Sequence, residues 1–175
     1  MFLRNIAMFV AGFTVVACGS MQTSATSTTR TTNVPMGHID ARLMPLVNRF
    51  LDSCREAGRT CQTNGLEARV LDTVKTEESP DRVGVCYLGF DENNTFRRLI
   101  HVTELATEVQ FQALVVHELA HCSMNVGHVD TEPHLMNSYL LDTRTLTENW
   151  EALYRAVFTT VYAERLGLTA GDEVE

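Results

Sequence analysis

The sequence contains few basic residues, and they do not form clusters. Its 14 Lys and Arg residues are outnumbered by 22 Asp and Glu residues, which gives a formal net charge of −8 at pH 7. Nucleic acids and anionic lipid surfaces attract basic patches, so a chain without such patches suits neither of them. We therefore expect no nucleic-acid partner and no electrostatic attachment to a membrane.

Apolar runs long enough to cross a bilayer are also absent. The run at Ile6–Val16 is too short to span a membrane and suits the apolar region of a signal peptide. It follows a single positive charge at Arg4 and overlaps Val15-Val16-Ala17-Cys18, which resembles a bacterial lipobox. Residues 1–17 therefore predict a lipoprotein signal peptide, with Cys18 as the lipidated first residue of the mature chain. The alternative is an ordinary secretory signal in which Cys18 is incidental.

The chain after the signal divides into a tether and one domain. Residues 18–36 are rich in Ser and Thr, lack an apolar period and predict a flexible tether. Residues 37–175 show no internal repeat and are enough for one domain with its own core. By resemblance to bacterial lipoproteins, Gly19 after the cysteine favours the outer membrane over the inner membrane. We expect a monomer in the bacterial cell envelope, held to the membrane by its lipid.

A metal-binding motif lies in the second half of the chain. In His117-Glu118-Leu119-Ala120-His121 the two histidines are four residues apart, so they leave the same face of a helix. His128 offers a third nitrogen ligand, which leaves the fourth position of one zinc ion open for water or substrate. Glu118 is placed to act as a general base rather than as a ligand. An open position is typical of catalytic zinc sites, whereas structural sites use four protein ligands.

His128 can join this site only if the helix ends before it. On a continuous helix it would lie about 10 Å beyond His121, at a rise of 1.5 Å per residue. Asn125 and Gly127 are residue types that accept the left-handed conformation of a helix end. We therefore expect the chain to turn back between Met124 and Gly127.

Other residues are candidates for the third ligand. They are two residues close to His128 and, in an arrangement of the gluzincin type, two glutamates of the following helix: His134, Asp130, Glu148 and Glu151. The glutamate arrangement would leave His128 and the segment around Met136 without a role. His38 and His101 have no partner at metal-ligand spacing, so we expect them to be structural or solvated.

The motif resembles that of the metzincin clan of zinc endopeptidases. The two helical histidines with their glutamate and the returning His128 match the clan's site, and Leu135-Met136-Asn137-Ser138-Tyr139 resembles its Met-turn beneath the metal. The resemblance implies a zincin-like fold, one zinc ion, hydrolysis of peptide bonds and a position for Met136 under the metal. Tyr139 would either help to polarise a substrate carbonyl or only pack, since its spacing from Met136 is three rather than two.

One feature departs from the clan's pattern. The usual pattern has Gly three residues and His six residues after the second histidine, but those positions hold Met124 and Gly127 here. His128 comes at the seventh position, so the chain contains one extra residue. We expect the loop between the two histidines to absorb this residue, as in a divergent bacterial or phage-type family.

The cysteines after Cys18 are even in number: Cys54, Cys61, Cys86 and Cys122. In an exported chain this suggests two disulfides, for which three pairings exist. We favour Cys54–Cys61, which closes a short loop, and Cys86–Cys122, which ties a strand to the motif helix. Free buried thiols are the alternative.

The remaining pattern predicts an α+β domain with a small mixed sheet, an active-site helix and a C-terminal helix. The predicted elements are helices at 40–56, 108–124 and 145–165 and strands at 66–74, 83–90 and 98–103, the last two strands as a hairpin. Capping signals begin the second helix at Thr107 and the third at Thr145-Leu-Thr-Glu148, and Gly167 stops the third. An apolar stripe should anchor the motif helix in the core: Phe111, Val115, Leu119 and Cys122.

These features together predict a zinc-dependent endopeptidase that is anchored to the bacterial envelope and acts on a protein or peptide substrate. One alternative is a zinc-binding protein that keeps the fold without activity. Another is a structural envelope lipoprotein whose motif is fortuitous. The sequence does not identify the substrate or the residues preferred at the cleavage site.

Overall fold

The computed structural model describes residues 35–75, 79–130 and 132–160. The predicted signal peptide, Cys18 and most of the tether lie outside the described residues. So do residues 161–175, where the last helix was expected to end. No helix among the described residues is long and apolar enough to cross a membrane.

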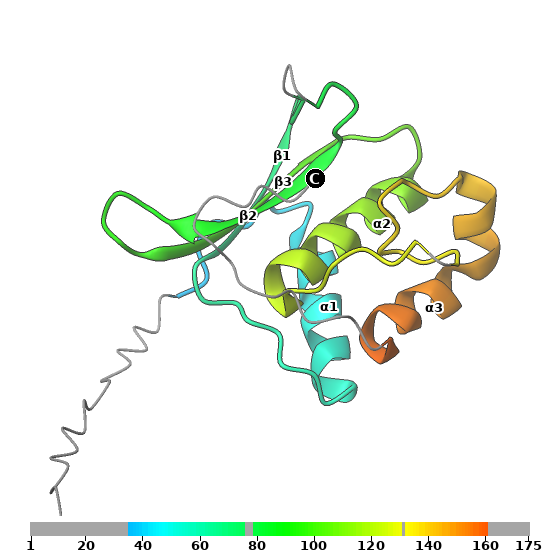
Figure 1. The fold of residues 1–175 in the computed structure, drawn as a ribbon, viewed down its shortest axis with the longest axis horizontal. Coiled ribbons are helices and arrows are strands. Elements are labelled where there is room, and N and C mark those ends of the chain that lie inside the picture. Colours follow the sequence, from blue (N-terminus) through cyan, green and yellow to red (C-terminus); the bar gives the residue numbers. More distant parts are fainter. Residues whose placement is uncertain (1–34, 76–78, 131, 161–175) are drawn as a thin grey trace, which may run out of the picture. The chain divides into compact units, whose positions relative to one another are not determined.

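The described chain is a mixed α+β domain with three α-helices and one small sheet (Figure 1). This confirms the predicted α+β class with a small mixed sheet. In chain order the elements are α1 (Met44–Glu56), β1 (Leu66–Leu71), β2 (Gly84–Phe90), β3 (Phe96–Thr103), α2 (Glu108–Leu119), the π-helix η1 (Ala120–Met124) and α3 (Thr143–Thr159).

The three strands form a mixed sheet in the order β1-β3-β2. β1 is parallel to β3, and β2 is antiparallel to β3 as the predicted hairpin requires. β1 ends at Leu71 rather than at Val74, because Leu71 pairs with Thr103, where β3 itself ends. β3 begins earlier than expected, because Phe96 pairs with Phe90 directly beside the turn. β2 is left as an edge strand.

Helix α2 is the central element of the domain. It packs against β2 and β3 on one side and contacts α1 and α3 on the other (Figure 1). The apolar stripe predicted for this helix is buried at all four positions: Phe111, Val115, Leu119 and Cys122. Burying such a stripe is the main source of stability for a helix of this length, so the sheet and its neighbours fix where α2 lies.

Both outer helices begin at positions that differ from the predicted ones. α1 begins at Met44, with Pro45 in its first turn, because the chain from Asp40 forms a separate turn before it. α3 begins at Thr143, and Asp142 is its N-cap, accepting a hydrogen bond from the backbone N–H of Thr145 at 2.9 Å. The capping box predicted to start at Thr145 is therefore wrong, since an aspartate three residues earlier caps the helix instead.

The structure contains both of the favoured disulfides, Cys54–Cys61 and Cys86–Cys122. The first closes the loop that follows α1. The second joins β2 to η1, so it ties the sheet to the end of the motif helix.

Candidate metal centre

The two helical histidines converge as their spacing predicts. The Thr107 side chain caps α2 by accepting a hydrogen bond from the backbone N–H of Gln110, which fixes where the helix starts. His117 lies in the last turn of α2 and His121 in η1. Their Nε2 atoms are 2.8 Å apart, so one ion could bind both nitrogens.

The motif helix ends in a π turn and then a left-handed residue. Asn125 has φ 55° and ψ 42°, and its backbone N–H bonds to the carbonyl of His121. The expected turn is therefore present at Asn125. Gly127 does not share this role, because its φ is not positive and a Cβ there would meet nothing within 4 Å.

Two groups from elsewhere in the chain satisfy the carbonyls at this helix end. The buried side chain of Arg98, on β3, donates from Nη1 to the carbonyl of Cys122 at 2.6 Å. The backbone N–H of Gln62 bonds to the carbonyl of Ser123 at 2.8 Å. A cation at the C-terminal end of a helix also interacts favourably with the helix dipole. These contacts, together with the Cys86–Cys122 disulfide, hold η1 and its histidine in place.

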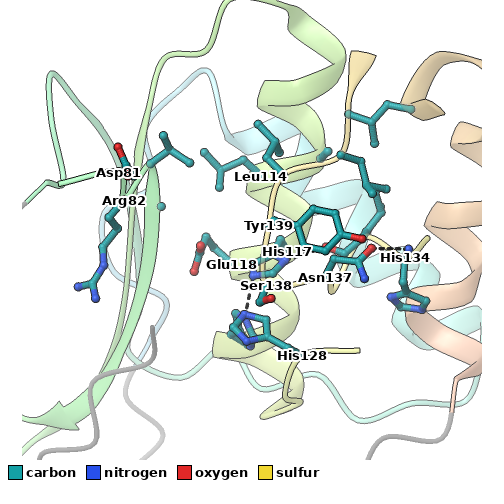
Figure 2. A pocket seen from close by; sticks show the side chains of 18 of the residues that line it. Asp81, Arg82, Leu114, His117, Glu118, His128, His134, Asn137, Ser138 and Tyr139 are labelled. Carbon is teal, nitrogen blue, oxygen red and sulfur yellow. Dashed lines mark hydrogen bonds between the residues drawn. The ribbon is translucent and has the colours of Figure 1, made fainter. Parts of the chain in front are cut away.

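His128 comes back to the two helical histidines after the turn. Its Nε2 lies 3.2 Å from the Nε2 of His121. One ligand atom from each of the three side chains lies within 4.8 Å of the other two. Figure 2 shows His128, from the segment after the helix, near His117 and Glu118, which are neighbours on α2. The structure therefore brings together all three predicted ligands as a group that could hold a metal ion.

The second nitrogen of each helical histidine bonds to the backbone. Nδ1 of His117 is 2.7 Å from the carbonyl of Leu135, and Nδ1 of His121 is 2.7 Å from the carbonyl of Val126. A carbonyl can only accept, so Nδ1 carries the proton in both rings and Nε2 keeps its lone pair. This is the arrangement that orients histidine ligands in metal sites, and a set of three imidazoles suits a divalent transition metal such as zinc.

Asn137 holds the loop that carries His128. It is buried, and its amide uses both its acceptor and its donors. Oδ1 accepts from the backbone N–H of His134 at 2.7 Å, and Nδ2 donates to the carbonyls of Val129 at 2.6 Å and Glu132 at 3.1 Å. These bonds connect the residue next to His128 with the predicted Met-turn. This role is not predictable from the sequence, because an asparagine following a methionine gives little signal for it.

Further bonds join the same two segments. The backbone N–H of Val129 donates to the carbonyl of Met136 at 2.7 Å, and Met136 itself is fully buried. Oδ1 of Asp130 accepts from the backbone N–H of Ser138 at 2.8 Å and from its hydroxyl at 3.1 Å. The backbone hydrogen bond from Ser138 is the main reason that the pKa of Asp130 lies below its usual range. Met136 thus lies between the two parts of the site. The residue before it, Leu135, bonds to His117 through its carbonyl. Met136 itself bonds to Val129, the residue after His128.

Burial strongly shifts the protonation of two groups in the site. It lowers the pKa of His117 to about 4, which keeps this imidazole neutral and able to bind a metal. It also raises the pKa of Glu118 to about 8, an effect that the positive charge of Arg82 opposes. A strongly shifted carboxyl beside three histidines is typical of a functional site.

Gly84 makes room for the Glu118 carboxyl. A Cβ at this position of β2 would lie 2.6 Å from Oε1 of Glu118 and 2.6 Å from Cδ1 of Leu114. Any side chain there would force the glutamate or the strand to move. Gly84 is not among the predicted site residues, although a glycine inside a strand is a signal for close approach by another group.

The three-histidine group lies in a cavity of about 600 Å³, which all three histidines and Glu118 line. Segments from β2, α2, the Met-turn and the start of α3 line it. Apolar side chains such as Leu114 and Leu141 form part of the wall. Tyr139 also lines the cavity, and its side chain is exposed, so the structure leaves it free to contact a substrate.

The alternative third ligands have other partners. His134 is buried, accepts from the backbone N–H of Met136 and contacts the Thr160 hydroxyl. Asp130 bonds to Ser138, as described above. The two glutamates of α3 form ion pairs on its exposed surface: Glu148 with Arg144, and Glu151 with Arg49. His38 and His101 are not part of the three-histidine group either.

No known family model matches this chain, and no curated protein or solved structure matches it.

Proposed function

We propose that this protein is a zinc-dependent endopeptidase of a metzincin-like, zincin-type fold. The observation that carries the proposal is the convergence of three imidazole nitrogens beside a buried glutamate that is not one of the ligands. A structural metal site has no need for that glutamate and normally has a fourth protein ligand. A catalytic site needs both the open position and the base.

Each chemical role can be assigned to a residue of the chain. His117, His121 and His128 would hold the ion, and bound zinc would supply a Lewis acid for the scissile carbonyl and for the attacking water. Glu118 would take a proton from that water and pass it to the leaving amine. The positive charge of a zinc ion bound to the three histidines would lower the pKa of Glu118. It would thereby favour the ionised form that a base requires. Tyr139 is a candidate for contact with the substrate carbonyl.

The π turn gives further support to the metzincin resemblance. The clan's pattern ends the helix three residues after the second histidine and returns the third histidine at six. Here the left-handed Asn125 and the ligand His128 lie at four and seven, so both are displaced by one residue. A π turn accommodates one additional residue within a helix. We therefore infer that η1 absorbs the extra residue, rather than the loop after the helix as the sequence had suggested.

We also propose that the enzyme works in the bacterial envelope, held there by a lipid on Cys18. Two disulfides suit an exported protein, because such bonds persist in oxidising compartments. The signal peptide and the lipidated cysteine lie outside the described residues and remain predictions from the sequence. The tethered domain would act on proteins or peptides that reach the envelope.

The proposal can be tested with the purified chain and two glutamate variants. Glu118→Gln keeps the size of the side chain but cannot accept the proton, so zinc content should persist while cleavage of a peptide library falls about 10²- to 10⁴-fold. Glu108→Gln is the matched control, because Glu108 is an exposed residue in the first turn of the same helix. It should keep both properties.

Three results would contradict the proposal. Unchanged cleavage by Glu118→Gln would remove the proposed base. Stoichiometric zinc without cleavage of any peptide would indicate an inactive zinc-binding protein. Absence of stoichiometric zinc would indicate a structural lipoprotein. Zinc by elemental analysis and cleavage by mass spectrometry separate these cases.

A further inference from the structure

The cavity around the three histidines contains one Lys or Arg side chain among its described lining residues, that of Arg82. A cation in this position is unexpected, because the chain as a whole carries a formal net charge of −8. The rest of the described lining is apolar or neutral, apart from Asp81, Glu118 and the histidines. Arg82 therefore gives the cavity a positive charge that no Lys or other Arg among the described lining residues supplies.

Arg82 lies just before β2 and lines the same cavity as Glu118. Two residues further along, Gly84 allows the Glu118 carboxyl to approach the strand closely. The positive charge of Arg82 acts on Glu118, where it opposes the effect of burial. Figure 2 shows the Arg82 side chain extending away from the neighbouring Asp81 carboxylate, on the β2 side of the cavity. Arg82 and Glu118 thus line the same cavity from different elements.

The known contacts of Arg82 do not neutralise it. Its Nη2 donates to the Ser79 hydroxyl at 3.1 Å, which is a bond to a neutral group. Among the described residues no carboxylate lies within ion-pair distance of it, whereas Arg97, on β3, pairs with both Asp91 and Glu67. A guanidinium has five N–H donors in a planar fork that fits a carboxylate through two parallel bonds. Arg82 is half-buried and lines the cavity.

We propose that Arg82 binds a carboxylate of the substrate and makes the enzyme selective for peptides with a carboxylate close to the scissile bond. The inference rests on the proposed peptidase function. That carboxylate could belong to an acidic side chain or to a free C-terminus, since the chemistry is the same. Arginine suits this task better than lysine, because it orients the carboxylate as well as attracting it.

The test uses matched octapeptides built on a sequence that the enzyme cleaves in the library. One series replaces each position in turn by Glu or by Gln, with an amidated C-terminus. A second series keeps all side chains neutral and compares a free C-terminus with an amide. We expect kcat/KM to be about tenfold or more higher for the preferred acid peptide than for its neutral partner, as one charge-assisted bidentate pair provides. The series that shows the preference identifies the source of the carboxylate.

Three variants connect the preference to Arg82. Arg82→Gln should abolish the preference, so that the ratio of kcat/KM for the acid peptide to that for the neutral peptide falls to about one, and Arg82→Lys should retain part of it. Arg155→Gln removes the same charge from an exposed position on α3 outside the cavity, and it should leave the preference intact. Equal loss on acid and neutral peptides in Arg82→Gln would overturn the inference, because it would indicate a structural role.

A binding measurement makes the result independent of catalysis. The zinc-loaded Glu118→Gln protein should bind the uncleaved acid peptide about tenfold more tightly than its neutral partner, and adding Arg82→Gln should remove the difference. Equal binding of the two peptides would overturn the inference even if the enzyme cleaves both. If the wild type cleaves no peptide, tighter binding of the acid member of a matched pair would still support carboxylate binding by Arg82, and only the peptidase function would be refuted.

Discussion

The three histidines of the site come from two regions that are held in place in different ways. His117 and His121 belong to a helix whose apolar stripe is buried between the sheet and two other helices. His128 belongs to a loop without regular structure, where side chains bond to the backbone. Asn137 provides three of these bonds and Asp130 one, and Asp130 also accepts a bond from the Ser138 hydroxyl.

The difference shows two physical routes to a precise ligand position. In the helical region, packing fixes the helix, and the four-residue spacing then aligns the two rings. In the loop region there is no helical hydrogen-bond pattern, so side-chain hydrogen bonds fix the backbone between core residues such as Val126 and Met136. Removal of one hydrogen bond in the loop should therefore lower the metal affinity in part. Removal of a histidine ligand from the helix should abolish metal binding.

The largest effect is expected for loss of a helical ligand. His121→Ala leaves two imidazoles, which bind zinc weakly, so zinc and peptide cleavage should be lost together. His38→Ala is the control, because it removes an exposed histidine that is outside the three-histidine group. Zinc per protein after dialysis is the measurement. Full zinc occupancy in His121→Ala would show that this residue is not a ligand.

The second prediction concerns the stability of the metal-free protein, because the helical region buries an acid. The pKa of Glu118 is about 8 in the folded chain and about 4.5 in the unfolded chain. Between these values the folded state keeps a proton that the unfolded state has released, so this group lowers stability as the pH rises from about 4.5 to about 8. Glu118→Gln does not titrate and should be more stable than the wild type by about 4 kcal/mol at pH 8, with almost no difference at pH 4.5.

Urea unfolding of both metal-free proteins across this pH range measures the difference. The lowered pKa of His117 has the opposite sign, since the unfolded state binds a proton between about 4 and 6.5 and stability rises with pH there. That contribution is common to both proteins and cancels. Parallel stability curves for the two proteins would contradict a buried acid at Glu118.

The third prediction weakens the loop region while leaving the helix unchanged. Asn137→Leu has a similar volume but leaves the carbonyl of Val129 and the N–H of His134 without their partner. Zinc affinity should fall about 10- to 100-fold, as is typical when a group that orients a ligand is removed. Asn149→Leu, on the exposed face of α3, is the control. Unchanged zinc affinity in Asn137→Leu would contradict the proposed difference between the helical and loop regions. So would a loss of zinc as complete as in His121→Ala.

The same distinction explains what the sequence could and could not predict. The spacing of His117 and His121 and the stripe beginning at Phe111 follow a helical period, so the helix and its two ligands could be predicted. The end of the helix near Asn125 could also be predicted, because His128 can reach the other two histidines only if the chain turns back. The residues that hold the loop have no period, so the roles of Asn137 and Gly84 became visible only from their contacts in three dimensions.

The start of α3 and the π turn are further examples. Thr145 and Glu148 match a capping pattern, but Asp142 competes for the same helix start and caps it with its own side chain. The π turn at η1 depends on partners distant in the sequence, since Arg98 and Gln62 satisfy its carbonyls. Local signals could not include these partners, and the motif helix was therefore expected to be a regular α-helix to its end.

The most direct test of the central claim is the coordination of zinc in the loaded protein. X-ray absorption and an anomalous-scattering crystal structure should give one zinc ion bound by the Nε2 atoms of His117, His121 and His128, at about 2.0–2.1 Å, with a non-protein oxygen as the fourth ligand. That result would join the helical and loop regions in one open site of the catalytic type. A fourth ligand from the protein, or a zinc ion that does not bind His128, would contradict the account.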